Sequence, residues 1–105
     1  MPALEDPNTG ITVWESGAIL EYLIETYDKE GKLTATDEKS KWALKQYLHF
    51  QMSGQGPYYG QAMWYHRIQP ENESAKERYI DQVVRVMEVL DNILKDKKYL
   101  VADKL

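Results

Sequence analysis

The chain opens with two short strand-like segments and then changes to a helical pattern. The segments Ala3–Asp6 and Ile11–Trp14 flank Pro7–Gly10, a cluster of residues that favours a tight reversal. From Ser16 onward, apolar residues recur at spacings of three and four, and Gly31 is a candidate stop. The pattern predicts a β-hairpin followed by a helix that runs towards Gly31.

Helical patterns fill the rest of the chain. Residues 31–36 are aperiodic, and a helix is predicted to begin at Thr36 or Asp37. Two glycines and Pro57 predict a kink or break at Ser53–Pro57, because proline lacks a backbone donor and disfavours helical dihedrals at the preceding residue. A further helix is predicted over 57–67, and a last one carries an apolar stripe from Tyr79 to Ile93 that is typical of helix packing.

The predicted hairpin raises a physical difficulty. A two-stranded hairpin alone is marginal in water, and the sequence offers no third strand to extend it. The chain also begins directly on the first strand and ends in the apolar run 99–105. We therefore expect both ends to be cut from a longer protein.

Composition narrows the function classes. The 105 residues are 43% hydrophobic and 29% charged, which is typical of a globular protein rather than a disordered one. A net charge of −4 argues against nucleic-acid binding, and no apolar run is long enough to span a membrane. There is no cysteine, and His49 and His66 lack the spacing of metal ligands, so we expect a cytoplasmic protein without a metal.

The strongest chemical signal lies at the predicted junction between the second strand and the first helix. A helix N-terminus presents free N–H groups and partial positive charge, so Ser16 could hold a carboxylate there. The neighbouring Glu15 could hold an ammonium group, and the pair would suit the head group of an α-amino acid. The alternative is that Ser16 only caps its helix and Glu15 only interacts with the helix dipole.

These segments resemble a known family. Met1-Pro2-Ala3-Leu4, followed after a hairpin by Trp14-Glu15-Ser16-Gly17-Ala18-Ile19, is similar to the second half of the thioredoxin-like domain of glutathione transferases. The segment Phe50–Pro57 and the pair Gly60-Gln61 resemble one subgroup, the fungal nitrogen-regulator-like and bacterial nu-class proteins. The resemblance implies an α+β, mostly helical fold. Residues 1–30 would be the C-terminal part of a thioredoxin-like domain, residues 31–36 a linker, and residues 37–105 the first part of an all-helical domain.

The resemblance also implies site residues. In the family, the proline of the x-Pro-Ala-Leu segment is cis and the residue before it binds the cysteinyl part of glutathione, roles that would fall on Pro2 and Met1. Glu15 and Ser16 would bind the γ-glutamyl end. The residue that contacts the sulfur would lie upstream of this chain. Candidates for the wall of the second-substrate pocket are Gln51, Ser53, Gln55, Tyr58, Tyr59 and Trp64, although aromatic residues after a kink also serve interhelical packing.

Several functions stay open at this level. The implied activity is conjugation of glutathione, as co-substrate, to an electrophile, or its exchange with a disulfide, in detoxification or in fungal secondary metabolism. The family implies a homodimer. The alternatives are a non-catalytic protein of the same fold that binds a regulatory partner, and an inactive truncated product.

Overall fold

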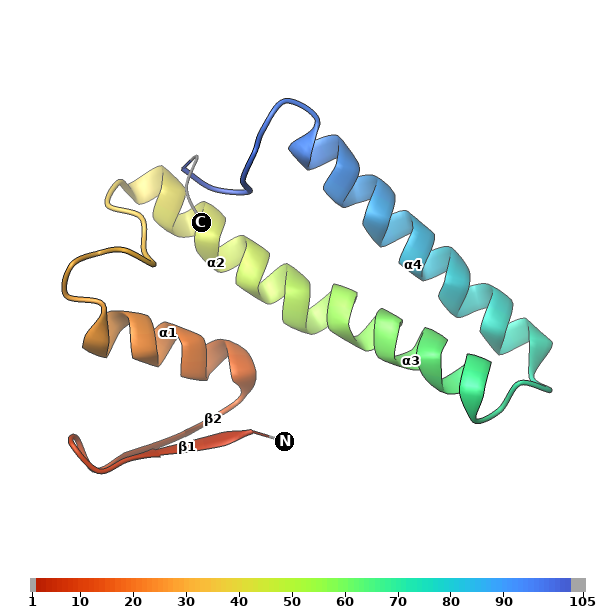
Figure 1. Ribbon diagram of the computed structural model, residues 1–105, viewed down its shortest axis with the longest axis horizontal. Coiled ribbons are helices and arrows are strands. Elements are labelled where there is room, and N and C mark those ends of the chain that lie inside the picture. The colour runs from red at the N-terminus through yellow and green to blue at the C-terminus, as the bar shows by residue number, and fades with distance from the viewer. Residues whose placement is uncertain (1, 103–105) are drawn as a thin grey trace.

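The computed structural model describes residues 2–102. The hairpin consists of β1 (Ala3–Asp6) and β2 (Ile11–Trp14), which pair antiparallel with Ala3 opposite Trp14 and Asp6 opposite Ile11. Gly10 adopts φ 71° in the connecting turn, a conformation that glycine reaches without steric cost. Figure 1 shows α1 lying alongside this hairpin, and the predicted hairpin is confirmed.

Helix α1 (Ser16–Tyr27) ends four residues before the expected stop at Gly31. The cause is Asp28, which follows the helix and whose carboxylate accepts hydrogen bonds from the backbone of the connecting segment. The donors are the amides of Lys32, Leu33 and Thr34, at 2.8, 2.8 and 3.1 Å. Gly31 instead turns the chain at φ 65°. An aspartate that binds amides ahead of it competes with continuation of the helix.

Of the kink or break expected at Ser53–Pro57, the break is wrong, because the backbone stays helical, but the regular α-helix is interrupted just before Pro57. Helix α2 (Glu38–Phe50) leads into a π-helical turn, η1 (Gln51–Gln55), and then into α3 (Gly56–Arg67). The amide of Gly56 bonds to the carbonyl of Gln51, five residues back. A π-turn widens the helix locally. Pro57 falls in the first turn of α3, where its missing N–H and fixed φ are tolerated.

Substitution by alanine is expected to change stability in opposite directions at Gly56, which follows the π-turn directly, and at Gly60, which lies within α3. A Cβ at Gly56 would lie 3.2 Å from the Gln51 carbonyl oxygen, whereas a Cβ at Gly60 meets nothing within 4 Å. Gly60→Ala should therefore stabilise the protein by about 0.5–1 kcal/mol through helix propensity. Gly56→Ala should lower the free energy of unfolding by about 1 kcal/mol. Urea unfolding of both variants checks this, and equal gains would contradict it.

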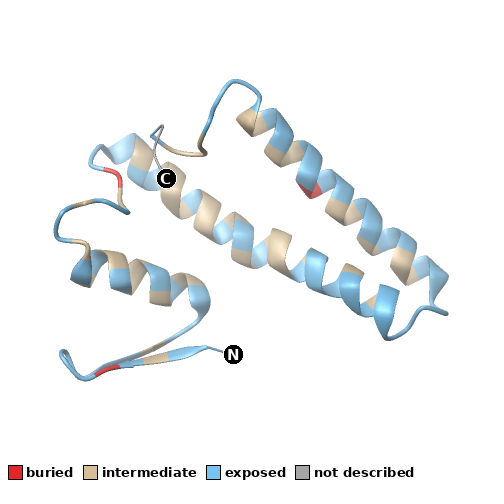
Figure 2. Cartoon of the chain, viewed as in Figure 1, coloured by how far each residue is buried: buried red, intermediate tan, exposed pale blue. Residues whose placement is uncertain are grey.

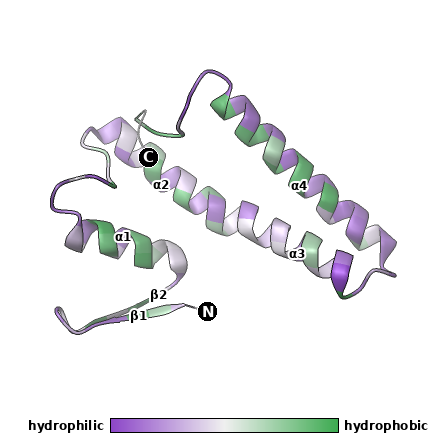
Figure 3. Cartoon of the chain, in the orientation of Figure 1, coloured by the Kyte–Doolittle hydropathy of each residue, from purple (hydrophilic) through white to green (hydrophobic). Residues whose placement is uncertain are grey.

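Helix α4 (Glu73–Leu94) packs along α3, as Figure 1 shows. The ring of Tyr65 stacks on that of Tyr79 with centroids 5.4 Å apart, and the Arg85 guanidinium lies 5.7 Å from the centroid of the Tyr58 ring. Val86 of α4 is 1% exposed. These contacts show that the predicted apolar stripe is a packing seam between helices. Figure 3 shows that apolar residues on α4 alternate with hydrophilic ones along the helix.

The elements lie in a single layer. The extents are 49 × 38 × 16 Å, and the shortest is only slightly more than the diameter of one helix, about 10–12 Å. The accessible surface is 8099 Å², compared with about 6,100 Å² for a compact protein of this mass. Figure 2 shows few buried positions, and those found in residues 2–102 are Asp6, Ala35 and Val86.

Two further features are absent from residues 2–102. None of the helices there is long and apolar enough to cross a membrane. No cluster of three or more His, Cys, Asp or Glu side chains in the same range could hold a metal ion.

Candidate functional site

A sharp corner joins the hairpin to α1. β2 ends at Trp14, α1 begins at Ser16, and Glu15 between them adopts φ 75° and ψ 122°. A non-glycine residue at positive φ is uncommon and costs about 1–3 kcal/mol, so the surrounding structure must hold it in place. Glu15 and Ser16 are both exposed at this corner. Their side chains are therefore accessible to a ligand from solvent.

The N-terminus of α1 has no side-chain cap. α2 begins with Asp37, which accepts from the Ser40 amide at 2.9 Å, and α4 begins with Asn72, which accepts from the Ala75 amide at 3.2 Å. At α1 the first backbone bond is from Ile19 to Glu15, at 2.9 Å. The Ser16 hydroxyl makes no hydrogen bond within the described chain. The interpretation that Ser16 only caps its helix is therefore not supported.

The corner lies against the π-turn. A Cβ at Gly17 would be 3.3 Å from the sulfur of Met52, so the first turn of α1 approaches η1 closely. This contact brings the predicted wall residues Gln51, Ser53 and Gln55 into the neighbourhood of the corner, because they belong to the same five-residue turn. Gln51 and Ser53 are exposed, and Gln55 is half-buried.

The other predicted residues lie apart from one another. Tyr58 is half-buried, and its ring faces Arg85 of α4. Tyr59 is 36% exposed and Trp64 is 50% exposed. At 100° per residue along α3, Tyr59 and Trp64 lie on different sides of the helix. Pro2 is exposed, whereas Met1 and its bond to Pro2 lie outside the described residues.

Sequence reasoning missed a polar cluster at the turn end of the hairpin, away from the corner. Asp6 is 4% exposed, and its carboxylate accepts hydrogen bonds from the hydroxyls of Tyr22 and Tyr27 and from the Asn8 amide, the first at 2.5 Å and the last at 2.9 Å. The hydrogen bond from Tyr22, followed by that from Tyr27, lowers the pKa of Asp6 to about 2. The bond to Asp6 raises the pKa of Tyr27. The hydrogen bond thus favours the ionised carboxylate of Asp6 and the protonated hydroxyl of Tyr27.

These pKa shifts predict how stability depends on pH. The Asp6 pKa is about 2 in the folded protein and 3.8 ordinarily, so the unfolded chain binds more protons between these values. The contribution of Asp6 is therefore fully present above about pH 4 to 5 and is lost as the pH falls towards 2. Urea midpoints of the wild type and Asp6→Asn should differ at pH 6 and converge near pH 2. A difference that does not change with pH would contradict this prediction.

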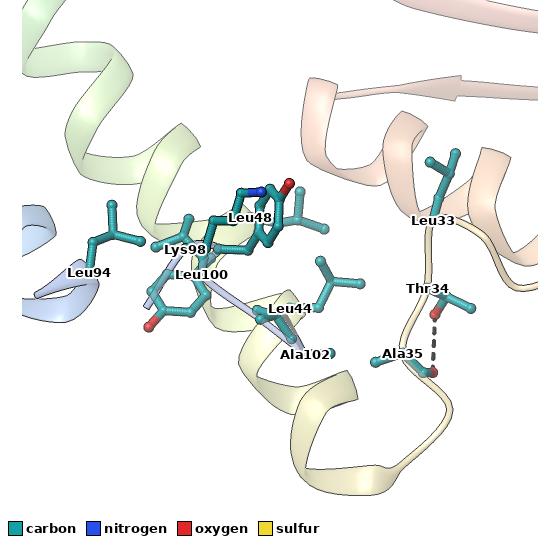
Figure 4. A pocket seen from close by; sticks show the side chains of 12 residues that line it. Leu33, Thr34, Ala35, Leu44, Leu48, Leu94, Lys98, Leu100 and Ala102 are labelled. Atoms are coloured by element: carbon teal, nitrogen blue, oxygen red, sulfur yellow. Dashed lines mark hydrogen bonds between the residues drawn. The ribbon is translucent and has the colours of Figure 1, made fainter. Parts of the chain in front are cut away.

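An apolar cavity lies elsewhere in the described chain. It has a volume of about 450 Å³ between the linker, α2 and the segment after α4, and Figure 4 shows Leu44 and Leu48 of α2 with Leu33 and Leu100 around it. Its remaining lining residues are Thr34, Ala35, Tyr47, Leu94, Lys98, Tyr99, Val101 and Ala102. None of them is a predicted site residue, so the cavity is separate from the corner.

Comparisons with known proteins find relatives whose sequences align with nearly the whole chain. It is 50% identical over 96 residues to the glutathione S-transferase-like protein gedE of Aspergillus terreus, spanning 90% of this chain and 42% of the relative. It is 46% identical over 107 residues to glutathione S-transferase 2 of Schizosaccharomyces pombe, spanning 99% of this chain and 46% of the relative. The chain thus spans less than half the length of these relatives. No protein-family model matches it.

The fold has equally close counterparts. Ure2p5 from Phanerochaete chrysosporium, crystallised with 1-(S-glutathionyl)-2,4-dinitrobenzene, superposes with a TM-score of 0.90 and 45% identity. The match covers 100% of this chain and 50% of Ure2p5. This confirms the predicted fold class, a hairpin and helix from a thioredoxin-like domain followed by part of an all-helical domain. In sequence and in fold, the chain is therefore similar to glutathione S-transferase-like proteins of the Ure2 type, over about half of their length.

Proposed function

We propose that the corner of this chain binds the γ-glutamyl end of glutathione in a glutathione transferase. The observation that carries the proposal is the uncapped N-terminus of α1, where an exposed Ser16 and Glu15 stand side by side. The α-carboxylate of the γ-glutamyl group would accept from the Ser16 hydroxyl and the first amides of α1. The ammonium group would pair with the Glu15 carboxylate. The relatives' names and a conjugate-bound structure support this assignment.

The proposed reaction uses the glutathione thiol. As a thiolate, its sulfur attacks an electrophilic carbon, a carbon–sulfur bond forms, and the leaving group departs or the adduct is protonated. Exchange with a disulfide is the other reaction open to the same thiolate. The residues of this chain would hold and orient glutathione for either reaction. Gln51 and Ser53 are the wall residues we assign to the second-substrate pocket, because they flank Met52, which lies close to Gly17. We assign Tyr58 to the interface between α3 and α4, because its ring faces Arg85.

The remaining expectations belong to the whole protein. We propose that residues 1–30 belong to the glutathione-binding domain and residues 37–105 to the helical domain, and that residues 31–36 form the linker between them. We also propose a cytoplasmic homodimer that pairs largely through the first two helices of the helical domain and the hairpin region. The many apolar side chains exposed on this single layer, such as Trp42, Ile80 and Met87, are consistent with pairing.

Calorimetric titration with glutathione tests the proposed function, with circular dichroism to report folding. The 105-residue chain is titrated first, and then a chimera in which it replaces the matched segment of the fission yeast transferase. We expect binding by the chimera, and by the chain itself where it is folded. Ophthalmic acid, in which a methyl group replaces the thiol, should bind comparably, because the corner does not contact the sulfur. A folded chimera that binds neither ligand would refute the proposal.

A further inference from the structure

The cluster of Asp6 with Tyr22 and Tyr27 stands out because Asp6 is the only buried residue within 2–27, although Tyr27 itself is 47% exposed. α1 has no buried residue, and its Leu20 and Leu23 are 47% and 38% exposed. The hydroxyl of Tyr22 lies 2.5 Å from Thr9 Oγ1, and Asn8 Nδ2 donates to the Tyr27 hydroxyl at 3.2 Å. Hydrogen bonds to a carboxylate are stronger than those between neutral groups. The main attachment of the turn to α1 is therefore polar.

The position of this attachment matters more than its strength. In the hairpin register, Trp14 lies opposite Ala3 at the corner end, and Asp6 lies opposite Ile11 at the turn end. α1 runs back from the corner for about 18 Å, so its last turn lies near the hairpin turn. Figure 1 shows the hairpin turn and the end of α1 on the same side. The cluster thus joins the far end of the hairpin to the middle of α1 through Tyr22 and to its last residue through Tyr27.

We propose that Asp6, Tyr22 and Tyr27 are positioning residues that fix the angle between β2 and α1 and so hold Glu15 and Ser16 ready for the γ-glutamyl group. The inference rests on the proposed function for its ligand. A residue at positive φ relaxes when its surroundings allow it. Without the hydrogen bonds of Asp6 to Tyr22 and Tyr27, the corner at Glu15 and Ser16 would sample other conformations. Glutathione would then bind only the fraction of molecules in the competent conformation. The apparent affinity falls in proportion to the population of that conformation.

The test compares variants that keep the shape of the cluster with variants that remove its bonds. Tyr22→Phe with Tyr27→Phe keeps both rings and removes both hydroxyls. Asp6→Asn keeps one acceptor oxygen, whereas Asp6→Ala keeps none. We expect the Kd for glutathione to rise about 10-fold in the double phenylalanine variant, corresponding to about 1.4 kcal/mol. Asp6→Ala should bind more weakly than Asp6→Asn, a partial rescue by the conservative change.

Asp28→Ala is the matched control. Like Asp6, Asp28 lies at the end of a secondary-structure element and its carboxylate accepts three hydrogen bonds, but the donors are backbone amides of the linker rather than groups of the hairpin and α1. It should change the unfolding midpoint and leave glutathione affinity as it is. A merely structural role predicts instead that affinity falls in proportion to the free energy of unfolding in all variants. If Asp28→Ala loses affinity in the same proportion to its loss of stability as the cluster variants do, the proposal is overturned.

A second measurement separates this inference from the proposed function. Amide resonances of residues 15–18 are recorded by nuclear magnetic resonance without ligand, in the chain or in the chimera. We expect them to shift or broaden in the Tyr22→Phe, Tyr27→Phe variant and to stay unchanged in Asp28→Ala. If the wild type binds no glutathione but these resonances respond, the proposed ligand fails and the positioning role stands. Unchanged resonances with unchanged affinity would refute the positioning role.

Discussion

Replacing Ser16 by alanine is expected to weaken glutathione binding by roughly 1–3 kcal/mol, which is a roughly 5- to 150-fold rise in Kd. The hydroxyl would lose a hydrogen bond to a carboxylate, and such charge-assisted bonds are about twice as strong as neutral ones. Stability should change little, because Ser16 is exposed and makes no side-chain hydrogen bond within the described chain. Calorimetry on the chimera measures the affinity and urea unfolding measures the stability.

Ser74→Ala is the control for this prediction. Ser74 is also an exposed serine in the first turn of a helix, but α4 already has the Asn72 cap and lies outside the proposed site. It should leave glutathione affinity unchanged. An unchanged affinity in Ser16→Ala would show that the corner does not bind the γ-glutamyl carboxylate.

Val86→Asp is expected to disrupt the packing of α3 on α4. Val86 is 1% exposed, and an aspartate there would be a buried charge without a partner, which destabilises proteins by about 3–5 kcal/mol. Natural domains have a free energy of unfolding of only about 5–15 kcal/mol, and this layer buries few side chains. We therefore expect a large loss of helical circular dichroism or of the cooperative urea transition.

Val84→Asp is the matched control, because it makes the same change on the same helix at a side chain that is 47% exposed. Surface substitutions of this kind usually change stability by about 0.5 kcal/mol or less. Similar effects in the two variants would show that α4 does not pack on α3 through the Val86 face.

Local patterns were sufficient to predict most of the elements. The turn formers at Pro7–Gly10 predicted the hairpin, and Asp37 marked the start of α2. The end of α1 could not be placed as well, because Asp28 acts through amides four to six residues ahead of it. The sequence predicts a kink or break rather than a π-turn, because the rules for proline assume a regular α-helix. A wider turn removes the conflict at Pro57.

The corner residues Glu15 and Ser16 were predicted because their chemistry is local to one junction. The Asp6 cluster could not be predicted in the same way. Tyr22 and Tyr27 are five residues apart, about 140° around an α-helix, so they share no helical stripe. They meet only because the hairpin turn lies against the end of α1. The weak local signal was an aspartate at the end of a strand, immediately before a turn.

The π-turn also gives chain length an unusual meaning in this protein. In a loop, one residue more or less changes only the reach of the chain. Between α2 and α3, Gly56 bonds five residues back instead of four, so the π-turn takes up one extra residue with nearly the rotation of an α-turn. Loss of one residue there would restore an α-helix and leave α3 facing nearly the same way, whereas loss of one residue within α3 ahead of Tyr65 would turn the rest of that helix by about 100°. The stacking of Tyr65 on Tyr79 is therefore expected to survive a one-residue deletion at the π-turn better than one inside α3.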